Sequence, residues 1–472
     1  MRAIVLSAVG ACLAAAVVAA QAAPPPLAFM HVTLIDGSGS PAQADMTVVV
    51  SGNTISQVGK SAAVKLPANA RQIDARNQFM IPGLWDMHTH PFMRKNKMLP
   101  LLDLQLFIAN GITGIRDMGD QGVPDDFGDM PYVQDVEWRQ AVAGGAVIGP
   151  RMSVAGVIVD GPRSPRAGWA SVSTEGDGRK LVTSLKTMGV DFVKVYDRLP
   201  RDVFYAIADE AKKQGLTIAG HVPFSVSVAD ASDAGQRSEE HLWGMLVGLS
   251  SREAELAKVV NVDNRVGGLT ANLKTLLDTY SEEKALALFA KFKKNDTYIV
   301  PTLVTKVPAS VPMSDPRIAK YMSPALRADY HGRFKAAAAA AADPLRTQLS
   351  EMDFRMVREM NRAGVRMLAG TDTLSFGFDL HDELALLVKA GLTPMQALQT
   401  ATRNAAEFLG KLDTLGTVET GKLADMVVLD ANPLEAIANT TRIRSVVVNG
   451  RLLDRQALDL LLAAVEASAN GR

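Results

Sequence analysis

The chain has 472 residues, a length that suits a large domain with a smaller accessory domain better than one ordinary domain. Hydrophobic residues make up 47% and charged residues 21%, which excludes a globally disordered protein. Lysine plus arginine and aspartate plus glutamate each total 50, so the formal net charge is zero. The charge therefore gives no reason to expect nucleic acid or an anionic membrane as the main partner.

Residues 1–22 predict a secretory signal peptide. The run Ala3–Ala20 is almost wholly apolar, and Ala20-Gln21-Ala22 has the small-x-small pattern of a cleavage site. We therefore expect an exported protein, periplasmic or secreted, and an uncleaved N-terminal anchor is the alternative. A lipid on Cys12 is a weaker alternative, because the apolar run continues well beyond it. Cys12 is the only cysteine, so the mature chain offers a metal ion only nitrogen and oxygen ligands.

Residues 28–80 predict a small antiparallel unit of short strands and turns. Phe29–Ile35 and Met46–Val50 are rich in β-branched and other apolar residues, as strands are. Residues 411–455 return to the same β-character. We expect strands from both ends of the chain to form one composite β-sandwich, followed by a helix over residues 456–472.

Residues 81–410 alternate strand and helix signals, as βαβ units do. Amphipathic stretches such as Val203–Gln214, which ends at Gly215, separate the strands. Eight strand–helix units predict an α/β fold, a (β/α)8 TIM barrel, whose catalytic groups lie at the C-terminal ends of its strands. The expected strands cover residues 80–85, 112–117, 151–155, 192–196, 217–221, 237–241, 298–303 and 366–370.

Potential metal ligands occur where these strands end. His88 and His90 close an apolar run, and residues two apart in a strand point to the same face, so both can reach one ion. Each of four later strands also ends in a single potential metal ligand. Together they predict a two-metal hydrolase site that also contains Lys194, His221, His241 and Asp372.

Six motifs in order resemble the amidohydrolase superfamily, in particular its imidazolonepropionase-like and prolidase-like hydrolases. Each motif alone is weak, but the ordered set is specific and spans nearly all of the mature chain. The resemblance implies a (β/α)8 barrel flanked by a composite β-sandwich. The motifs are Pro-Gly-Leu-Trp-Asp-Met-His-Thr-His (82–90), Val-Lys-Val-Tyr (193–196), Ala-Gly-His-Val (219–222), Glu-Glu-His-Leu (239–242), Ala-Gly-Thr-Asp-Thr (369–373) and Gly-Lys-Leu-Ala-Asp-Met-Val-Val-Leu (421–429).

The resemblance also implies two divalent metal ions, with zinc as the default for nitrogen and oxygen ligands. In two-metal members a lysine of the fourth strand bridges the ions after CO2 converts its amine to a carbamate, and Lys194 occupies that place. An ammonium group has no lone pair to offer, so Lys194 could not bind metal unmodified. The alternative for Lys194 is a barrel lysine paired to an acid. The implied ligands are His88, His90 and Asp372 for one ion, and His221 and His241 for the other.

The resemblance implies hydrolysis of an amide C–N bond in a dipeptide, an Xaa-Pro dipeptide or an N-acyl amino acid. A metal-bridging hydroxide would be the nucleophile, with Asp372 as general base and then general acid. The same site would serve a lactonase, an esterase or a phosphotriesterase-like hydrolase, and an inactive binding protein on this fold is a third alternative. We expect a small-molecule substrate, no nucleic-acid partner and no membrane partner after signal cleavage; a homo-oligomer stays open.

Four further residues are candidates for contact with the substrate. Tyr196 lies two residues beyond Lys194 and should face the same cavity, where it could bind the substrate or simply form the rim. His381 follows the Asp372 loop and could contact substrate or cap a helix. Arg163 and Arg166 lie in the loop after the third strand, where they could meet an anionic group or be solvated.

Two acidic residues lie close to expected ligands in the sequence, and we do not expect either to bind metal. Asp117 ends the second strand, and we expect it to orient a neighbouring ligand rather than to bind metal. Glu240 precedes His241, and strand alternation predicts that it points to the opposite face and has a structural role.

Overall fold

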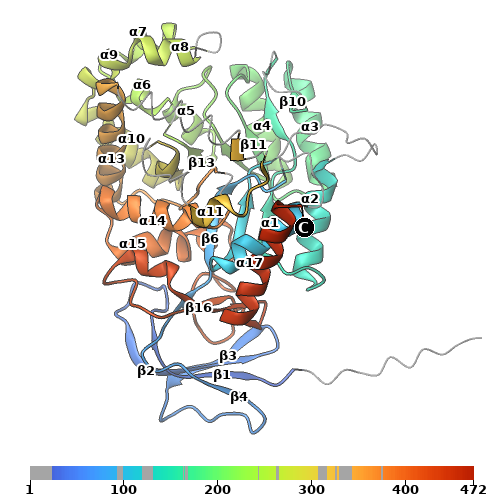
Figure 1. Ribbon diagram of the computed structural model, residues 1–472. Helices are drawn as coiled ribbons and strands as arrows, with labels where there is room; N and C mark the ends of the chain where they lie inside the picture. The colour runs from blue at the N-terminus through green and yellow to red at the C-terminus, as the bar shows by residue number, and fades with distance from the viewer. Residues whose placement is uncertain are drawn as a thin grey trace, which may run out of the picture.

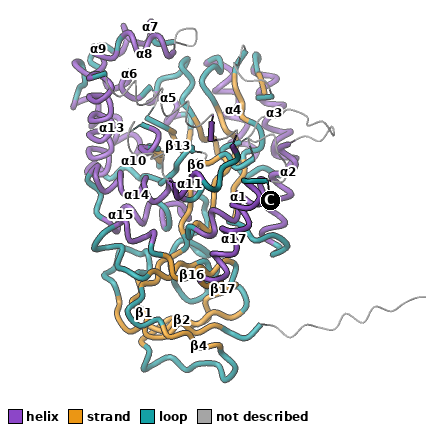
Figure 2. Tube along the Cα trace, viewed as in Figure 1, coloured by secondary structure: helices purple, strands orange, loops and turns teal. Residues whose placement is uncertain are grey.

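The computed structural model is shown in Figure 1, and Figure 2 separates its helices from its strands. The predicted signal peptide with Cys12, and both Arg163 and Arg166, lie outside the residues that the structure describes. Among the described helices, none is both long enough and apolar enough to cross a bilayer. The structure describes residues 24–92, 99–119, 131–162, 164, 168–242, 244–261, 265–306, 316–324, 327–328, 343–373 and 376–471.

Strands from both chain ends form one eight-stranded sheet at the lower end of the molecule in Figure 1. The order is β17-β16-β15-β5-β1-β2-β3, and β4 pairs with β1. Shared use of both ends agrees with the sequence, but the two-sheet sandwich is not confirmed, because all eight strands belong to a single sheet. The strands are β1 Leu27–Leu34, β2 Gln43–Ser51, β3 Thr54–Lys60, β4 Arg71–Asp74, β5 Phe79–Pro82, β15 Met426–Leu429, β16 Ile443–Val448 and β17 Arg451–Asp454.

The expected first barrel strand is divided at Gly83. The residues before it form β5 and pair antiparallel with β15, and the residues after it form β6 (Leu84–Thr89) in a different sheet. Gly83 donates its backbone N–H to Asp425 O at 2.9 Å. A Cβ at this position would lie 2.0 Å from Thr113 Oγ1, so only glycine fits the close approach. The short segment around Gly83 therefore joins the eight-stranded sheet to β6, the strand that carries His88.

The remaining strands run parallel, as the alternating pattern predicts. β6 belongs to a three-stranded sheet, β6-β7-β8, and a six-stranded sheet has the order β10-β9-β11-β12-β13-β14. Parallel neighbours bring the C-terminal ends of consecutive strands to the same edge. The strands are β7 Ile112–Asp117, β8 Arg151–Val154, β9 Ile158–Asp160, β10 Ala170–Ser171, β11 Phe192–Val195, β12 Thr217–Gly220, β13 Gln236–Glu240 and β14 Tyr298–Val300.

The expected eighth strand, residues 366–370, is an extended segment between the two parallel sheets. Leu368 N–H bonds Ile299 O of β14 at 2.9 Å, and Met87 N–H of β6 bonds Ala369 O at 2.8 Å. No strand ladder joins β8 to β11 in the described part of the chain. The predicted TIM barrel is therefore confirmed in part: the parallel segments and their order are present, but pairing is not continuous around a closed barrel.

Helices connect and surround the parallel strands, as Figure 2 shows. α4 forms over the predicted stretch and ends where Gly215 adopts φ 67°, a left-handed conformation that glycine favours. The C-terminal helix α17 begins at Arg455 and is capped by Asp454, whose side chain accepts Ala457 N–H. The helices are α1 Leu99–Ala109, α2 Pro131–Ala143, α3 Glu175–Met188, α4 Arg201–Gln214, α5 Val228–Asp233, α6 Met245–Leu249, α7 Glu253–Val259, α8 Arg265–Ala271, α9 Leu273–Asp278, α10 Glu282–Asn295, η1 Leu303–Thr305, α11 Pro316–Ala319, α13 Pro344–Ala363, α14 Phe378–Ala390, α15 Pro394–Thr400, α16 Arg403–Phe408, η2 Ile437–Thr441 and α17 Arg455–Ala469.

Candidate metal centre

Four of the predicted ligands form a cluster of imidazole rings at the strand ends. His88 lies on β6 and His90 directly after it, while His221 follows β12 and His241 follows β13. The ring centroids of His88 and His241 are 4.5 Å apart, those of His88 and His90 5.4 Å, and those of His221 and His241 4.8 Å. The structure therefore brings together histidines that are far apart in the sequence.

Glu240 and His241 both face this cluster, although they are adjacent in sequence. Glu240 Oε2 lies 2.8 Å from His88 Nδ1, so the expectation that Glu240 points to the opposite face is wrong. The reason is the backbone at His241, whose φ is 66°, and at Leu242, whose φ is 58°. Strand alternation applies only while the backbone stays extended, and the left-handed turn at His241 ends it.

Each histidine of the cluster has one ring nitrogen held by the protein. In all four cases this is Nδ1, and its partner is a carboxylate, a backbone carbonyl or a hydroxyl. Metal-binding histidines have this pattern, because the held nitrogen fixes the ring and leaves the other one for the ion. The pairs are His88 with Glu240 Oε2 at 2.8 Å, His90 with Gly119 O at 2.7 Å, His221 with Asp197 Oδ1 at 2.8 Å, and His241 with Thr302 Oγ1 at 2.7 Å.

Asp372 faces the opposite ring nitrogens. Its Oδ1 lies 3.3 Å from His90 Nε2 and 3.7 Å from His88 Nε2, and its Oδ2 lies 3.5 Å from His241 Nε2. One donor atom each from His88, His241 and Asp372 lie within 4.8 Å of one another, a spacing suitable for an ion. The Asp372 backbone has φ 52°, and its N–H bonds His88 O at 2.7 Å, which ties the two ligand segments together.

The protonation states suit metal binding. Burial lowers the pKa of His88 to about 3, and burial followed by the charge of Lys194 lowers the pKa of His221 well below its usual value. Burial also lowers the pKa of His241, so these three rings are neutral at pH 7 and carry a lone pair. Burial opposes ionisation of Asp372, but the neighbouring imidazoles of His88 and His90 hold the pKa of its carboxyl well below the usual range.

Lys194 lies on β11 beside the cluster and is almost completely buried, with 1% of its surface exposed. Within the described residues its Nζ has no hydrogen-bond partner, and no ion pair includes it. The alternative of a lysine paired to an acid is not seen as a hydrogen bond or an ion pair in this part of the chain, although the charges of Glu240 and Asp372 are near enough to oppose the fall that burial causes in the pKa of Lys194. Burial lowers the pKa of Lys194 to about 8. An unpaired buried ammonium is costly, which favours the neutral amine or an anionic derivative of it.

Sequence comparison places this site in a known family. The model of the amidohydrolase family matches residues 79–453, which include all six predicted ligands. The chain belongs to the amidohydrolase family. Among curated relatives of this amidohydrolase, a probable imidazolonepropionase of Nematostella vectensis is 40% identical over 84 residues, which cover 16% of this chain and 19% of that protein. The aligned segments cover no more than 28% of the first such relatives' own lengths.

Solved structures show the same amidohydrolase fold over most of the chain. A structure described as a putative prolidase from Bifidobacterium longum superposes with a TM-score of 0.66 and 23% identity, covering 94% of this chain and 99% of that one. The bottromycin amidohydrolase superposes with a TM-score of 0.71 and 24% identity, covering 94% of this chain and 91% of that one. At this identity the likeness establishes the fold.

Arg116 is a site residue of this amidohydrolase that sequence reasoning missed. Its fully buried guanidinium donates to Met87 O at 2.6 Å, to Ser238 Oγ at 2.8 Å and to Glu240 Oε1 at 2.8 Å. Although burial opposes ionisation, Arg116 and the His88 hydrogen bond lower the pKa of Glu240 to about 2. Arg116 thus holds an ionised Glu240 against His88. An arginine inside the strand expected over residues 112–117 was the available signal.

Asp86 is a second residue that the sequence analysis did not assign. It is buried below the cluster and accepts the backbone N–H groups of His88 at 3.1 Å and Thr371 at 3.0 Å. It also accepts the Thr371 hydroxyl at 2.7 Å. Asp86 therefore joins β6 to the segment that ends at Asp372. The signal was a lone acid within the apolar run that leads to His88.

Of the other residues to which the sequence analysis gave a role, Tyr196 and Asp117 lie near the histidine cluster, and His381 does not. Tyr196 faces it as expected, because its ring stacks on His221 with centroids 4.1 Å apart. Asp117 Oδ1 accepts Gly119 N–H at 3.1 Å, and the Gly119 carbonyl contacts His90, so its orienting role is indirect.

His381 does not join the cluster, and the expectation that it contacts substrate needs correction. On α14 its Nδ1 lies 2.9 Å from Thr440 Oγ1 of η2, and its Nε2 lies 3.1 Å from Asn110 O, just after α1. Both ring nitrogens therefore have partners within the protein. The position of His381 after the Asp372 loop, which suggested contact with the substrate, does not determine which way the ring points.

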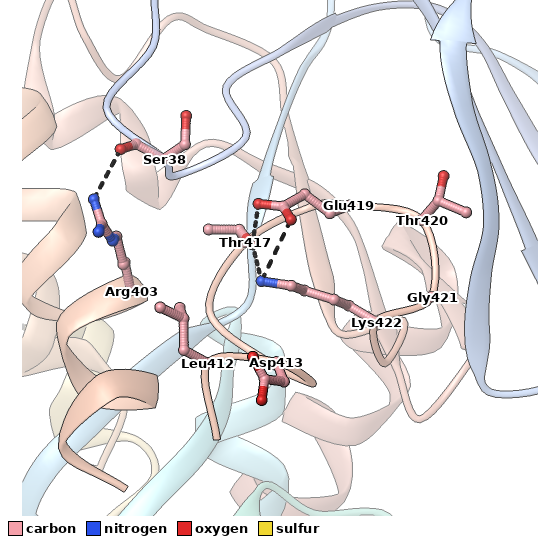
Figure 3. A pocket seen from close by; sticks show the side chains of 9 residues that line it. All are labelled: Ser38, Arg403, Leu412, Asp413, Thr417, Glu419, Thr420, Gly421 and Lys422. Carbon is pink, nitrogen blue, oxygen red and sulfur yellow. Dashed lines mark hydrogen bonds and ion pairs between the residues drawn. The ribbon is translucent and has the colours of Figure 1, made fainter. Parts of the chain in front are cut away.

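A polar cavity of about 570 Å³, shown in Figure 3, lies away from the predicted ligands. Lys422 Nζ donates to Thr417 Oγ1 at 2.5 Å and lies 3.6 Å from Glu419 Oε2, while Arg403 donates to Ser38 O at 3.2 Å. These cations already have partners. None of the predicted ligands lines this cavity, so its size does not make it the candidate active site.

Proposed function

We propose that the protein is a metal-dependent amidohydrolase that cleaves an amide C–N bond in a dipeptide, an Xaa-Pro dipeptide or an N-acyl amino acid. The observation that carries the proposal is the orientation of the four histidines. Each has Nδ1 held by a protein group, and three of them turn Nε2 toward Asp372. Such an arrangement is what a metal centre needs and what a merely structural cluster does not.

The donor set fits two divalent ions, with His88, His90 and Asp372 for one and His221 and His241 for the other. Bound there, such ions would lower the pKa of a water molecule to near neutrality and polarise a substrate carbonyl. Zinc suits these nitrogen and oxygen ligands.

Lys194 would supply the bridging ligand after modification. Its buried amine, with a pKa of about 8, is partly neutral at pH 7 to 8 and can attack CO2. The new N–C bond gives a carbamate anion, and the amine releases one proton. This change would replace a buried unpaired cation with an anion that has two oxygens, which also explains why no acid is paired with Lys194 among the described residues.

Asp372 would transfer the proton during hydrolysis. Its carboxylate is ionised, partly exposed with 33% of its side chain accessible, and directed at the cluster. It can therefore accept a proton from the attacking water at one oxygen and deliver it to the leaving nitrogen. Tyr196, stacked on His221 at the rim, is placed to contact the substrate.

An amide substrate is favoured over an ester or a lactone by the related proteins. The structural relatives include a putative prolidase and a bottromycin amidohydrolase, and the curated relatives include an imidazolonepropionase, whose names all indicate C–N bond chemistry. The test combines the metal content of the purified protein with a hydrolysis screen over dipeptides, N-acyl amino acids and lactones. Two metal ions per chain and turnover of an amide are expected. Turnover of lactones alone would overturn the proposal.

A further inference from the structure

His241 is the one histidine of the cluster whose Nδ1 contacts a hydroxyl instead of a carboxylate or a backbone carbonyl. Thr302 Oγ1 lies 2.7 Å from this nitrogen. With Nε2 left for an ion, Nδ1 carries the proton and donates it to the Thr302 hydroxyl. Thr302 is buried and directly precedes the short helix η1. The orientation of His241 therefore depends on how the start of η1 is held.

Thr302 has a backbone conformation that threonine rarely adopts. Its φ of 46° and ψ of 49° are left-handed, and a β-branched residue keeps such angles only where surrounding contacts impose them. Threonine before a helix commonly caps it, because the hydroxyl accepts a free backbone N–H of the first turn. Within the described residues, the Thr302 side chain makes no capping hydrogen bond, and its hydroxyl contacts His241 instead. The first turn of η1 therefore needs an acceptor from another element.

Glu383 of α14 supplies this acceptor. Its Oε2 accepts the Val304 N–H at 2.8 Å, and the whole residue is buried. Val304 follows Thr302 by two residues, the position whose N–H a capping side chain ordinarily bonds. We propose that Glu383 is a positioning residue of the metal centre, which caps η1 in place of Thr302 and so leaves the Thr302 hydroxyl to orient His241. This inference rests on the proposed function, because it assigns His241 to a metal ion.

Glu383 and His381 lie two residues apart on α14 but contact different elements. Glu383 bonds the backbone of η1, whereas His381 Nδ1 lies 2.9 Å from Thr440 Oγ1 of η2. Both residues are buried and polar, and only the first is connected to a predicted metal ligand. The helix therefore offers its own matched control, since a change at His381 disturbs α14 without touching the cap of η1.

The role proposed for Glu383 requires an oxygen atom and not a charge. Burial raises the pKa of Glu383 to about 8, so its carboxyl group is largely protonated at pH 7, and the carbonyl oxygen of a neutral carboxyl still accepts an N–H. Glutamine has the same length and also presents an oxygen, so Glu383→Gln should keep the cap. Glu383→Met removes the acceptor at similar length, and Glu383→Asp keeps the carboxyl but is too short to reach Val304.

The experiment titrates zinc into the metal-free protein at pH 7.5 and resolves the affinities of the two ions. Groups that orient a metal-binding histidine contribute about 10- to 100-fold to affinity. Glu383→Met and Glu383→Asp should therefore weaken the ion assigned to His221 and His241 by at least about tenfold and leave the other ion nearly unchanged. Thr302→Val, which replaces the hydroxyl with a methyl group, should weaken the same ion by about 10- to 100-fold. Glu383→Gln and His381→Gln should bind as the wild type does.

Three results would overturn the assignment. The first is wild-type affinity for both ions in Glu383→Met and Glu383→Asp. The second is an equal loss of both ions in these variants, because a general loss of packing is not confined to His241. The third is normal binding by Thr302→Val, because the effect of Glu383 would then not pass through the Thr302 hydroxyl. If Glu383→Met does not fold, Glu383→Asp and Thr302→Val still decide among these results.

Nitrogen-15 NMR of the histidine rings in the metal-free protein separates this inference from the proposed function. The hydrogen bond to Thr302 selects the His241 tautomer that carries its proton on Nδ1. Glu383→Met should shift the His241 signals toward a mixture of tautomers, whereas Glu383→Gln should not. If the wild type binds no metal, the proposed function fails, and an unchanged His241 spectrum in Glu383→Met would then reject the positioning role as well.

Discussion

Within the described residues, buried histidines occur in two regions, at the strand ends and on α14, and the two regions differ in how the ring nitrogens are used. At the strand ends, Nδ1 of each of the four clustered histidines contacts a protein group, and in three of them Nε2 faces Asp372. On α14, His381 has both ring nitrogens engaged, with Thr440 and Asn110. Burial lowers the pKa of His88, His221 and His241 at the strand ends and also the pKa of His381 on α14. The comparison teaches that burial does not identify a site, whereas an uncommitted nitrogen beside a carboxylate does.

The candidate metal centre and the polar cavity of Figure 3 differ in how their buried lysines are balanced. In the polar cavity of Figure 3, Lys422 contacts Thr417 and Glu419. At the metal centre, Lys194 is more deeply buried and has no hydrogen-bond partner within the described residues. A buried amine without a hydrogen bond lowers stability, and this cost is what the proposed modification of Lys194 would remove.

Asp372→Asn should have the largest effect on activity. The amide can still coordinate a metal ion but cannot accept a proton at neutral pH. General acid–base catalysis contributes about 10²–10⁴-fold, so kcat should fall by that amount, and kcat/KM with it. Steady-state kinetics with metal analysis test this, and Tyr196→Phe should cause a smaller loss. Wild-type kcat with a normal metal content would exclude Asp372 from proton transfer.

Lys194→Ala should reduce the metal content below two ions per chain, because the anion that offsets the repulsion between the two cations is lost. It should lower kcat/KM by at least about 100-fold, since a metal ion that polarises the substrate contributes several kcal/mol to transition-state stabilisation. A short carboxylate such as acetate fits the space and the charge of the lost carbamate, so it should restore part of the activity. Full activity with two metals and no added carboxylate would contradict the carbamate.

Glu240→Gln should weaken metal binding by about 10- to 100-fold, because His88 loses the anion that orients it. It should also lower the free energy of unfolding by about 3–5 kcal/mol, since Arg116 stays buried without a countercharge. Glu239→Gln is the matched control. Burial, and then the charge of Glu240, raise the pKa of Glu239 well above its usual value, so a neutral amide should change little. Metal titration of both variants tests whether Glu240 supports metal binding through His88. Urea unfolding of both variants tests whether it stabilises the fold by balancing the charge of Arg116.

His381→Gln should alter the pH dependence of stability and leave kcat/KM nearly unchanged. Burial lowers the pKa of His381 to about 4, against 6.5 as the ordinary value. Above pH 6.5 its contribution is fully present, and as the pH falls toward 4 the unfolded chain takes up the proton first, so stability is lost. At about 1.4 kcal/mol per unit, the wild type should lose about 3 kcal/mol more than the variant across this window. Urea unfolding at pH 7.5 and 4.5 measures the difference, and a tenfold fall in kcat/KM would return His381 to the active site.

The sequence predicted the parts of the molecule that follow local rules. The spacing of His88 and His90 follows from strand alternation, and the order of the parallel strands follows from the alternating pattern. The strand ends supplied Lys194 and Asp372 as candidate ligands, and the resemblance supplied the role expected for each. Both ends of the chain were also expected to share one unit, although its single sheet was not foreseen.

The missed features depend on contacts between distant residues or on an irregular backbone. Arg116 meets Glu240 and Ser238 across the parallel strands, and no local pattern specifies that meeting. The direction expected for Glu240 was wrong because φ at His241 is positive, a conformation that is uncommon for residues other than glycine and that the strand pattern does not reveal. The direction of the His381 ring depends on Thr440, from a segment much later in the chain.

The junction at Gly83 constrains how the protein folds. β5 lies between β1 and β15, and it continues through Gly83 into the strand of His88. β15 is made from the last part of the chain, so this pairing has a very large sequence separation, which slows folding. The strand that carries His88 is synthesised early. The pairing of β5 with β15, which fixes the start of this strand, can form only after the last strands have been synthesised. Metal binding should therefore occur late in folding. Chains that end before β15 should not bind the two metal ions, even though they contain every predicted ligand.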